Sequence, residues 1–308
     1  MLDVQGLHLR AALFHSLRAF FREQEFLEVD TPIRQKILLP EANIIPIESE
    51  GSFLQTSPEL CMKRLLAAGC TRIFQICPCF RKEERGARHL EEFTMLEWYR
   101  RGEDYHALMK DCQSMVRRVT EELKAVCSPG GSSYQAVTKF DNLVKKKWER
   151  LTVKEAFIRY APVDMDAALR DESFDEILVE YIEPYLGQQK PTILYDYPIE
   201  LASLARTKPG NSQVAERFEL YISGVELANG FSELTDTSEQ RKRFHSELEL
   251  MAGKGKRVTQ MPEQFLEDLG KIESAAGIAF GVDRLLMLIF GKKHISAAVA
   301  FAPVDLDQ

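Results

Sequence analysis

A charged segment at residues 81–92 lies between two strand-like stretches, and its side chains are of the types that bind phosphate. Its cationic side chains are Arg81, Arg85, Arg88 and His89. Period-two alternation in the following stretch places on one face Phe93, Met95, Glu97 and Tyr99. Guanidinium groups beside an aromatic plate suit a nucleoside triphosphate. Composition alone fits a charged hairpin tip with an aromatic core stripe equally well.

A second segment, residues 218–233, reads as an acidic hairpin. Ser223 and Gly224 form a two-residue turn that places Tyr221 opposite Glu226, with Glu219 diagonal to Glu226 on the same face. Two such carboxylates repel unless a cation separates them, and Mg²⁺ on phosphate oxygens fits. The alternative is a solvent-facing hairpin, which the flanking apolar residues disfavour. Alternation puts Asn229 on the other face, so we expect a bulge or strand end near Gly230.

A third segment, residues 277–286, begins with small apolar residues that allow a close approach to a ligand. A helix then begins with Arg284 in its first turn, where a cation opposes the helix dipole and needs an anionic or aromatic partner. Cys77 and Cys79 suggest a metal site. Their spacing is not that of a zinc motif, so zinc is disfavoured and the six cysteines are expected to be reduced thiols.

The elements that must position these residues follow from periodicity and turn signals. Helices are expected at 7–24, 58–68, 103–126, 239–252, 262–271 and 282–289, and residues 151–187 read as mostly helical. Strands are expected at 26–32, 71–80, 93–101, 191–202, 214–222 and 225–231. Residues 128–147 are turn-rich and then polar, which favours a solvated loop or insertion. The pattern predicts an α+β fold around an antiparallel sheet flanked by helices, with no repeat and no linker between domains.

The composition is that of an ordinary globular protein, with 308 residues, 45% hydrophobic and 28% charged. The net charge of -7 makes a long nucleic-acid contact unlikely and suits a basic protein partner. No apolar run approaches the ~20 residues that span a bilayer, and the first ten residues do not resemble a signal peptide. The sequence therefore predicts a cytoplasmic protein without a membrane partner.

Taken together, the segments resemble the three motifs of the class II aminoacyl-tRNA synthetases. Residues 26–32 are similar to motif 1, with Pro32 at its dimer contact, residues 80–99 to motif 2, and residues 277–286 to motif 3. Residues 56–65 look like the amino-acid-binding segment of the lysyl-tRNA synthetases. The resemblance implies a class II catalytic domain over 1–308, with a variable insertion around 127–190, no anticodon-binding domain and a homodimer.

Within this family, residues 93–100 and 224–231 resemble lysyl-tRNA synthetase paralogues that attach (R)-β-lysine to a lysine of elongation factor P. Ala279 also stands where those paralogues have alanine and true lysyl-tRNA synthetases have glycine. The resemblance implies ATP and Mg²⁺ as cofactors and (R)-β-lysine or lysine as substrate. It departs from the family at Leu90, where asparagine is usual, and at Glu91, where proline is usual, which puts the nucleotide contact there in doubt.

The resemblance also implies residue roles. Arg81 would bridge the α-phosphate and the substrate carboxylate, and it would be catalytic together with Arg284. The expected ATP site is Arg81, Glu83, Arg88, His89, Phe93, Glu226, Leu227, Gly281 and Arg284, with Phe93 and Arg284 on either side of adenine. Mg²⁺ would be held by Glu219 and Glu226.

The expected amino-acid site is Ser57, Glu59, Glu97, Tyr99, Asn229, Glu233 and Ala279. Glu59 would bind the backbone-side amine and Asn229 the carboxylate. The distal ammonium would be bound by Glu97, Tyr99 and Glu233.

Three functions remain open at this point. The first is a ligase that modifies elongation factor P, and the second is a minimal synthetase that charges tRNA or another small acceptor. The third is an inactive, synthetase-like regulatory protein. The net negative charge and the missing N-terminal anticodon-binding sequence argue against the second function. The retained motif residues argue against the third.

Overall fold

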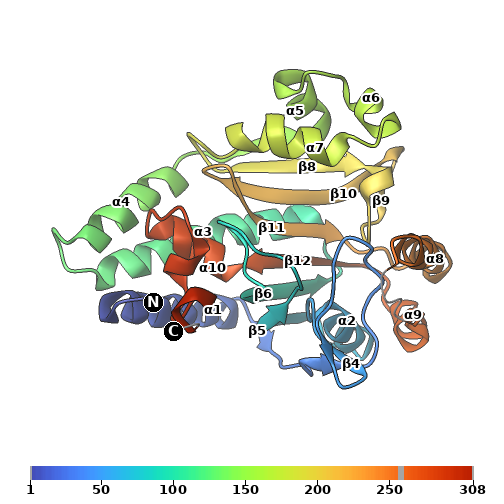
Figure 1. The fold of residues 1–308 in the computed structure, drawn as a ribbon, viewed down its shortest axis with the longest axis horizontal. Coiled ribbons are helices and arrows are strands. Elements are labelled where there is room, and N and C mark those ends of the chain that lie inside the picture. Colours follow the sequence, from blue (N-terminus) through green and yellow to red (C-terminus); the bar gives the residue numbers. More distant parts are fainter. Residues whose placement is uncertain (1, 256–259, 307–308) are drawn as a thin grey trace.

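A computed structural model describes residues 2–255 and 260–306. Over these residues a nine-stranded sheet runs through the molecule, and β12 lies at its middle between β6 and β11 (Figure 1). The strands, in spatial order, are β1 (Leu27–Glu28), β5 (Arg72–Phe80), β6 (Glu92–Arg101), β12 (Ala275–Gly281), β11 (Val225–Ser232), β10 (Asn211–Ile222), β8 (Thr192–Pro198) and β7 (Glu149–Thr152), with β9 (Thr207–Lys208) beside β10. The pairs from β5 to β8 are antiparallel, whereas the outer pairs β1–β5 and β7–β8 are parallel. The expected α+β class is confirmed.

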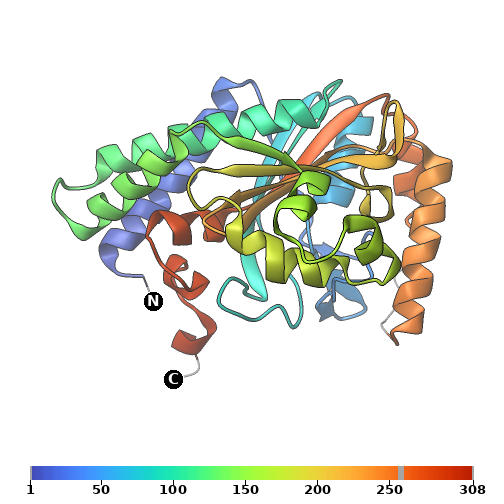
Figure 2. The same ribbon diagram turned by 90° about the horizontal axis from the view of Figure 1, so that it is seen from above.

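Four helices cover one face of this sheet and share its main hydrophobic core: α1 (Val4–Glu23), α3 (Tyr105–Val126), α4 (Ser132–Val144) and α10 (Val282–Ile289). Their apolar stripes, such as Leu9, Leu13 and Leu17 of α1, meet strand side chains such as Phe74 and Trp98. Figure 2 shows α3 and α4 lying side by side at one end of the molecule. The helices expected at 7–24, 103–126 and 282–289 are confirmed.

The expectation of a solvated loop at 128–147 was wrong, because α4 occupies most of it. Val137, Phe140 and Val144 are spaced as one helical face and are buried in the main core. The surrounding lysines hid this stripe in the sequence. The strand expected at 26–32 is reduced to the two residues of β1.

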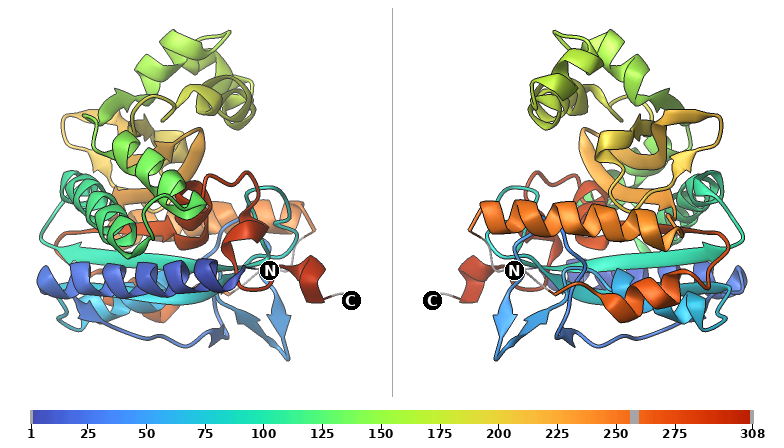
Figure 3. Two further views of the ribbon diagram at one scale, coloured as in Figure 1. Left: turned by 90° about the vertical axis from the view of Figure 1, so that its left-hand side faces the viewer. Right: turned by 90° about the vertical axis from the view of Figure 1, so that its right-hand side faces the viewer.

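A layer with its own core lies over β7, β8 and β10, at the top of Figure 1. It consists of α5 (Val153–Tyr160), α6 (Met165–Arg170), α7 (Phe174–Ile177), η1 (Leu178–Ile182) and η2 (Glu183–Tyr185). This layer agrees with the mostly helical character expected at 151–187. A small sheet of β2 (Arg34–Gln35), β3 (Glu48–Ser49) and β4 (Ser52–Leu54) projects from the opposite end (Figure 3).

The remaining helices pack near the end of the sheet that carries β1 and β5. They are α2 (Glu59–Ala67), α8 (Thr237–Gly253) and α9 (Glu263–Leu269), which share a third apolar cluster with Tyr99 and Ile73. Short turns η3 (Ile199–Leu201) and η4 (Ile295–Ala298) and helix α11 (Pro303–Leu306) complete the described chain. Within the described ranges, no helix combines the length and the apolar character needed to cross a membrane.

Candidate active site

The face of the sheet opposite the α1 and α3 helices carries rows of side chains that the strand register brings together. In one row, Glu97 of β6 is paired with Ala279 of β12, Ala279 with Asn229 of β11, and Asn229 with Glu219 of β10. Directly paired residues on neighbouring strands lie on the same face with Cβ atoms about 5 Å apart. Four residues that the sequence analysis assigned to substrate or metal are therefore neighbours across four strands.

The next row along the strands contains Tyr99, Gly277, Phe231 and Arg217. A Cβ atom on Gly277 would lie 2.2 Å from Tyr99 Cε1 and 2.3 Å from Glu233 Oε1. Both contacts are far below van der Waals distance, so only glycine fits here. Gly277 therefore allows Tyr99 and Glu233 to approach each other over the sheet.

The hairpin of β10 and β11 has the expected turn and pairing. Ser223 and Gly224 both have positive φ, as the favoured two-residue hairpin turn requires, and Tyr221 is paired with Glu226. The expected bulge exists but lies elsewhere: the register shifts between Leu220 and Tyr221, where Leu227 is the extra residue on β11, and not near Gly230. This shift puts Asn229 on the face that carries Glu226.

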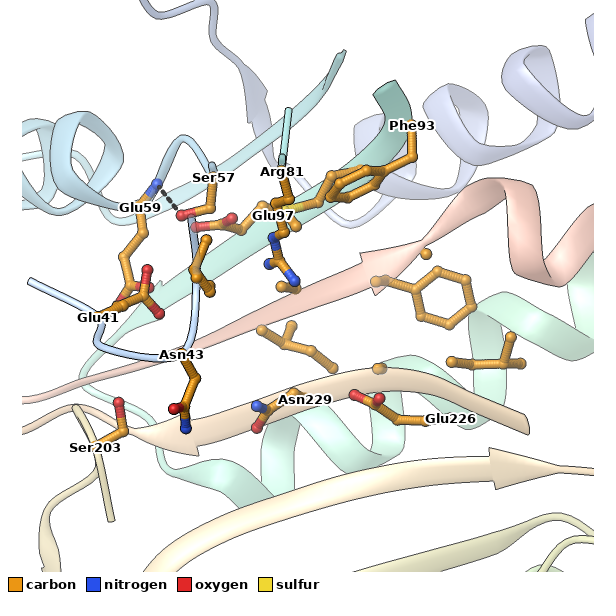
Figure 4. A pocket seen from close by; sticks show the side chains of 18 of the residues that line it. Glu41, Asn43, Ser57, Glu59, Arg81, Phe93, Glu97, Ser203, Glu226 and Asn229 are labelled. Atoms are coloured by element: carbon orange, nitrogen blue, oxygen red, sulfur yellow. Dashed lines mark hydrogen bonds between the residues drawn. The ribbon is translucent and has the colours of Figure 1, made fainter. Parts of the chain in front are cut away.

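A cavity of about 500 Å³ lies over these rows. Figure 4 shows Ser57, Glu59 and Arg81 along one side of it, and Glu226 and Asn229 on the strand opposite. Most of the expected site residues line it: Ser57, Glu59, Arg81, Arg88, His89, Phe93, Glu97, Tyr99, Glu226, Leu227, Asn229, Ala279, Gly281 and Arg284. Three expected residues are not in its lining: Glu83, Glu219 and Glu233.

One end of the cavity is acidic and buried. Glu97 is 2% exposed and accepts a hydrogen bond from the Tyr99 hydroxyl at 2.5 Å. Burial and the nearby Glu59 raise the pKa of Glu97 well above its ordinary value. Among the described residues, Glu97 Oε2 and Glu233 Oε1 have no hydrogen-bond donor. Such buried acceptors favour a ligand that brings its own donors, as an ammonium group does.

The other end of the cavity is cationic. The Arg81 guanidinium lies 5.3 Å from the centre of the Phe93 ring, and its Nη1 is 3.5 Å from Glu84. Arg284 donates to the Glu226 carbonyl at 2.9 Å, and its Nη2 is 2.7 Å from His89 Nε2. Burial, followed by the charge of Arg284, lowers the pKa of His89, so the imidazole is neutral at physiological pH.

Arg88 is held by the tip of the acidic hairpin. Its Nη1 donates to the Gly224 carbonyl oxygen at 2.6 Å. This bond ties the charged segment 81–92 to the β10–β11 turn, although the two are 136 residues apart. The arginine is thereby kept at the cavity wall, where Arg88 and Arg284 supply positive charge on either side of the neutral His89 imidazole.

Glu219 lies below the cavity within a network of donors. The hydroxyls of Tyr197 and Tyr221 both donate to Oε2 at 2.6 Å, and Arg217 donates to Oε1 at 2.7 Å. A carboxylate has about four lone-pair sites, so one remains open. Burial and then Glu219 raise the pKa of Glu226, as expected for two carboxylates facing one site. Two hard oxygen donors of this kind fit a magnesium ion that also binds phosphate.

Glu83 is the expected residue that fits least well. Its side chain is 66% exposed and it has a positive φ of 68°, while its backbone N–H donates to Glu91. Leu90, the departure from the family pattern, lines the cavity and packs against the main core. An apolar contact therefore replaces a polar one at this point of the wall.

Sequence reasoning missed three structural contributors to the site. Lys63 is buried between Glu59 and Glu233. Arg217 donates to Glu219 and also to the side-chain oxygen of Asn229 at 3.2 Å, and so links these two residues. Asp283 is buried, accepts from the Thr94 backbone at 2.6 Å, and pairs with Arg10 of α1. The available signal for Arg217 was its period-two spacing from Glu219; Lys63 had only its i,i+4 spacing from Glu59.

This fold and this site define a ligase-type catalytic domain that binds a nucleotide beside an amino acid. The family model for tRNA synthetases class II (D, K and N) matches residues 4–305, and the chain belongs to this family. Two curated relatives, from Salmonella gallinarum (strain 287/91 / NCTC 13346) and Salmonella typhi, are each named elongation factor P--(R)-beta-lysine ligase. Each is 36% identical to this chain, and the alignment covers 97% of this chain and 95% of the relative.

Proposed function

We propose that this chain activates (R)-β-lysine, or lysine, with ATP and transfers it to a lysine side chain of elongation factor P. As a class II synthetase, the chain is an ATP-dependent amino-acid ligase. The observation that carries the proposal is the row of Glu97, Ala279 and Asn229 on neighbouring strands, with Arg81 at the cationic end of the same cavity. The printed names of the relatives support elongation factor P as the acceptor.

The proposed amino-acid site is acidic at one end and cationic at the other. Glu97, Tyr99 and Glu233 would bind the distal ammonium, since two of their carboxylate oxygens lack donors among the described residues. Glu59, with Ser57 beside it, would bind the backbone-side amine, and Asn229 would donate to the carboxylate.

The proposed ATP site is the cationic end. Phe93 and Arg284 would hold adenine between them, and Arg88 and His89 would contact the outer phosphates. Leu227 and Gly281 line the same wall. Glu83 would reach the adenine amino group only if its exposed side chain turns inward, so its role carries the least support.

Glu219 and Glu226 would hold Mg²⁺. The ion would neutralise charge on the phosphates when it is bound. Among the described residues no group of three or more His, Cys, Asp or Glu side chains could hold a metal ion, so the two carboxylates would need phosphate oxygens as further ligands. Arg217 donates to Glu219 and holds its carboxylate in place in either case.

The chemistry needs no nucleophile from the protein. The substrate carboxylate attacks the α-phosphorus of ATP, pyrophosphate leaves, and an aminoacyl-adenylate forms. The neutral amine of the acceptor lysine then attacks the acyl carbon, AMP leaves, and an amide forms with loss of one proton. Arg81 would stabilise the negative charge that develops on the α-phosphate in the first step.

The first test is adenylate formation. Amino-acid-dependent exchange of pyrophosphate into ATP should be measurable with (R)-β-lysine, and Arg81→Ala should lower its rate by ~100-fold or more, the scale of losing one pre-organised donor. Arg150→Ala, on an exposed position of β7, is the matched control and should keep the full rate. Unchanged exchange in Arg81→Ala would show that the assignment of the cationic end is wrong.

The second test identifies the acceptor. The protein is incubated with ATP, either lysine isomer, and elongation factor P or tRNA, and the acceptors are weighed by mass spectrometry. We expect one added β-lysyl group on elongation factor P and none on tRNA. A charged tRNA with unmodified elongation factor P would instead support the minimal synthetase, and no transfer or exchange at all would support the regulatory alternative.

A further inference from the structure

Lys63 is a buried lysine whose ammonium group lies between two carboxylates of the proposed amino-acid site. Its Nζ is 2.5 Å from Glu59 Oε1 and 2.5 Å from Glu233 Oε2, and it lies 5.3 Å from the centre of the Phe231 ring. The side chain is 1% exposed and is not part of the cavity lining, whereas Glu59 is. Lys63 therefore acts on a bound molecule through its two glutamate partners.

The groups that face Lys63 come from several elements. Glu59 is on its own helix α2, Glu97 and Tyr99 are on β6, and Glu233 directly follows β11. Burial by itself would lower the pKa of Lys63, but Glu233 and Glu59 together raise it above its ordinary value. Lys63 is therefore charged. Glu41 also lines the cavity: burial and then the charge of Glu59 raise its pKa to about 7, and Arg81 is the cation that lowers it most.

The charges of this pocket can be counted among the described residues. Three carboxylates, Glu59, Glu97 and Glu233, accompany the Lys63 ammonium group, so these four side chains have a net charge of 1 - 3 = -2 when all are ionised, while the charge of Glu41 is offset by that of Arg81. A charge left uncompensated in a buried site is costly. A substrate with two ammonium groups would bring the pocket to neutrality, and a substrate with one would leave a negative charge.

We propose that Lys63 is a positioning residue that sets specificity, because it matches the net charge of the acidic pocket to a substrate with two ammonium groups. This inference rests on the proposed function, and it assigns to Lys63 the selection of amino acids that carry two ammonium groups. Lys63 also bridges Glu59 and Glu233 and so fixes the positions of the two carboxylates, one for each amine. Without it, the pocket would have three negative charges for two ammonium groups and would take up a proton.

The KM for lysine should depend on pH because Glu233 titrates near neutral pH. Burial raises its pKa to about 8, and Lys63 is the largest influence that lowers it. Glu233 must be ionised to pair with an ammonium group, so the KM for lysine should fall as pH rises from 6.5 toward about 8. Loss of Lys63 should raise the pKa of Glu233 further, which moves the midpoint of this profile to higher pH.

The experiment measures pyrophosphate exchange from pH 6.5 to 9 for the natural protein, Lys63→Met and Lys63→Arg. At pH 7 we expect Lys63→Met to raise the KM for lysine or (R)-β-lysine by ~10-fold or more, as expected when a buried charge loses its partner. The KM for ATP should change little, and the midpoint should move upward. Lys63→Arg keeps the charge and should keep the midpoint. The matched control is Lys145→Met, which removes another lysine in an i,i+4 ion pair, with Asp141.

A double variant separates charge matching from a structural role. Lys63→Met with Glu233→Gln removes one charge of each sign and restores a net charge of -2 from Glu59 and Glu97. The double variant should therefore have a lower KM for lysine than either single variant, and it replaces Lys63→Met if that protein is too unstable to assay. The inference is overturned if the increases in the KM for lysine of the two single variants add up in the double variant. It is also overturned if the pH midpoint of Lys63→Met is unchanged.

These outcomes are distinct from failure of the proposed function. If the natural protein shows no exchange with either lysine isomer, the function itself is wrong. If the natural protein is active but 6-hydroxynorleucine, which lacks the second ammonium group, is activated as well as lysine at pH 8, the function stands and charge matching is refuted.

Discussion

Ala279 is the single side chain between Glu97 and Asn229 in the row across the sheet. Its methyl group therefore lies between the groups that would bind the two ends of the substrate. A methyl group there takes space that the α-amine of α-lysine would need, and it favours an amine moved one carbon outward. The alternative is that Ala279 only packs against the small cluster of Cys77, Cys79 and Met95.

The natural protein should prefer (R)-β-lysine, and Ala279→Gly should gain activity with α-lysine. One methyl group in a pocket discriminates by roughly 1–3 kcal/mol. The ratio of kcat/KM values for the two isomers should therefore change by roughly 10–200-fold. Ala276→Gly removes a methyl group from the opposite face of the same strand and should leave the ratio unchanged. Equal ratios in the natural protein and Ala279→Gly would show that Ala279 does not set the choice.

At the scale of single residues, the sequence predicted those site residues whose side-chain type indicates a binding role. Arg81, Phe93, Glu97 and Asn229 were expected in the site, and all line one cavity. Lys63 was missed because a lysine in a helix is usually exposed, and only the tertiary structure shows that its ammonium group lies between Glu59 of the same helix and Glu233 of a distant segment.

At the scale of elements, β12 contributes to the site mainly because the face it turns to the cavity carries only small residues, Gly277 and Ala279 among them. Gly277 lies between Tyr99 and Phe231 in the second row, and the space above it is occupied by Tyr99 and Glu233. Small residues let two larger polar groups from neighbouring strands meet over the strand. The acidic end of the cavity therefore depends on the absence of a Cβ atom at this position.

Gly277→Ala should displace Tyr99 or Glu233 and raise the KM for lysine by ~10-fold or more, because a 1 Å displacement of a positioned group is enough for large losses. Steady-state pyrophosphate exchange with lysine and ATP varied separately measures this. Gly253→Ala is the control, since a Cβ atom there has nothing within 4 Å. A normal KM for lysine in Gly277→Ala would mean that Tyr99 and Glu233 do not bind the distal ammonium.

The hairpin of β10 and β11 shows why elements were only partly predictable. Local turn chemistry specified Ser223, Gly224 and the pairing of Tyr221 with Glu226. The position of the bulge at Leu227 depends on the packing of Leu227 and Ala228 into the main core, which is a non-local property. For the same reason, the buried stripe of α4 could not be recognised before α3 and α10 were in place.

At the scale of the whole molecule, the motif 1 region exposes apolar surface at one edge of the sheet. Leu27 of β1 is 58% exposed, and Ile33, just after this segment, is 40% exposed. β1 is the terminal strand of the sheet, and an open apolar edge favours association. We therefore propose that this edge pairs with a second copy of the chain.

The natural protein should have the mass of a homodimer at micromolar concentration, because an obligate interface of this kind keeps chains paired there. Leu27→Asp should shift the mass toward the monomer, while Ile158→Asp, at a 78% exposed apolar position on α5, should not. Light scattering across the micromolar range measures both. A monomer mass for the natural protein would remove this proposal.

The central place of β12 in the sheet has a consequence for how the chain is made. β6 is complete at residue 101 and β11 at residue 232, but β12, which joins them, ends only at residue 281. On the ribosome, two half-sheets with open edges must wait until residues 275–281 have been made before they can close. Such late, non-local pairing is slow and leaves partly folded chains prone to aggregation. A nascent chain therefore has no complete active site until β12 has been made.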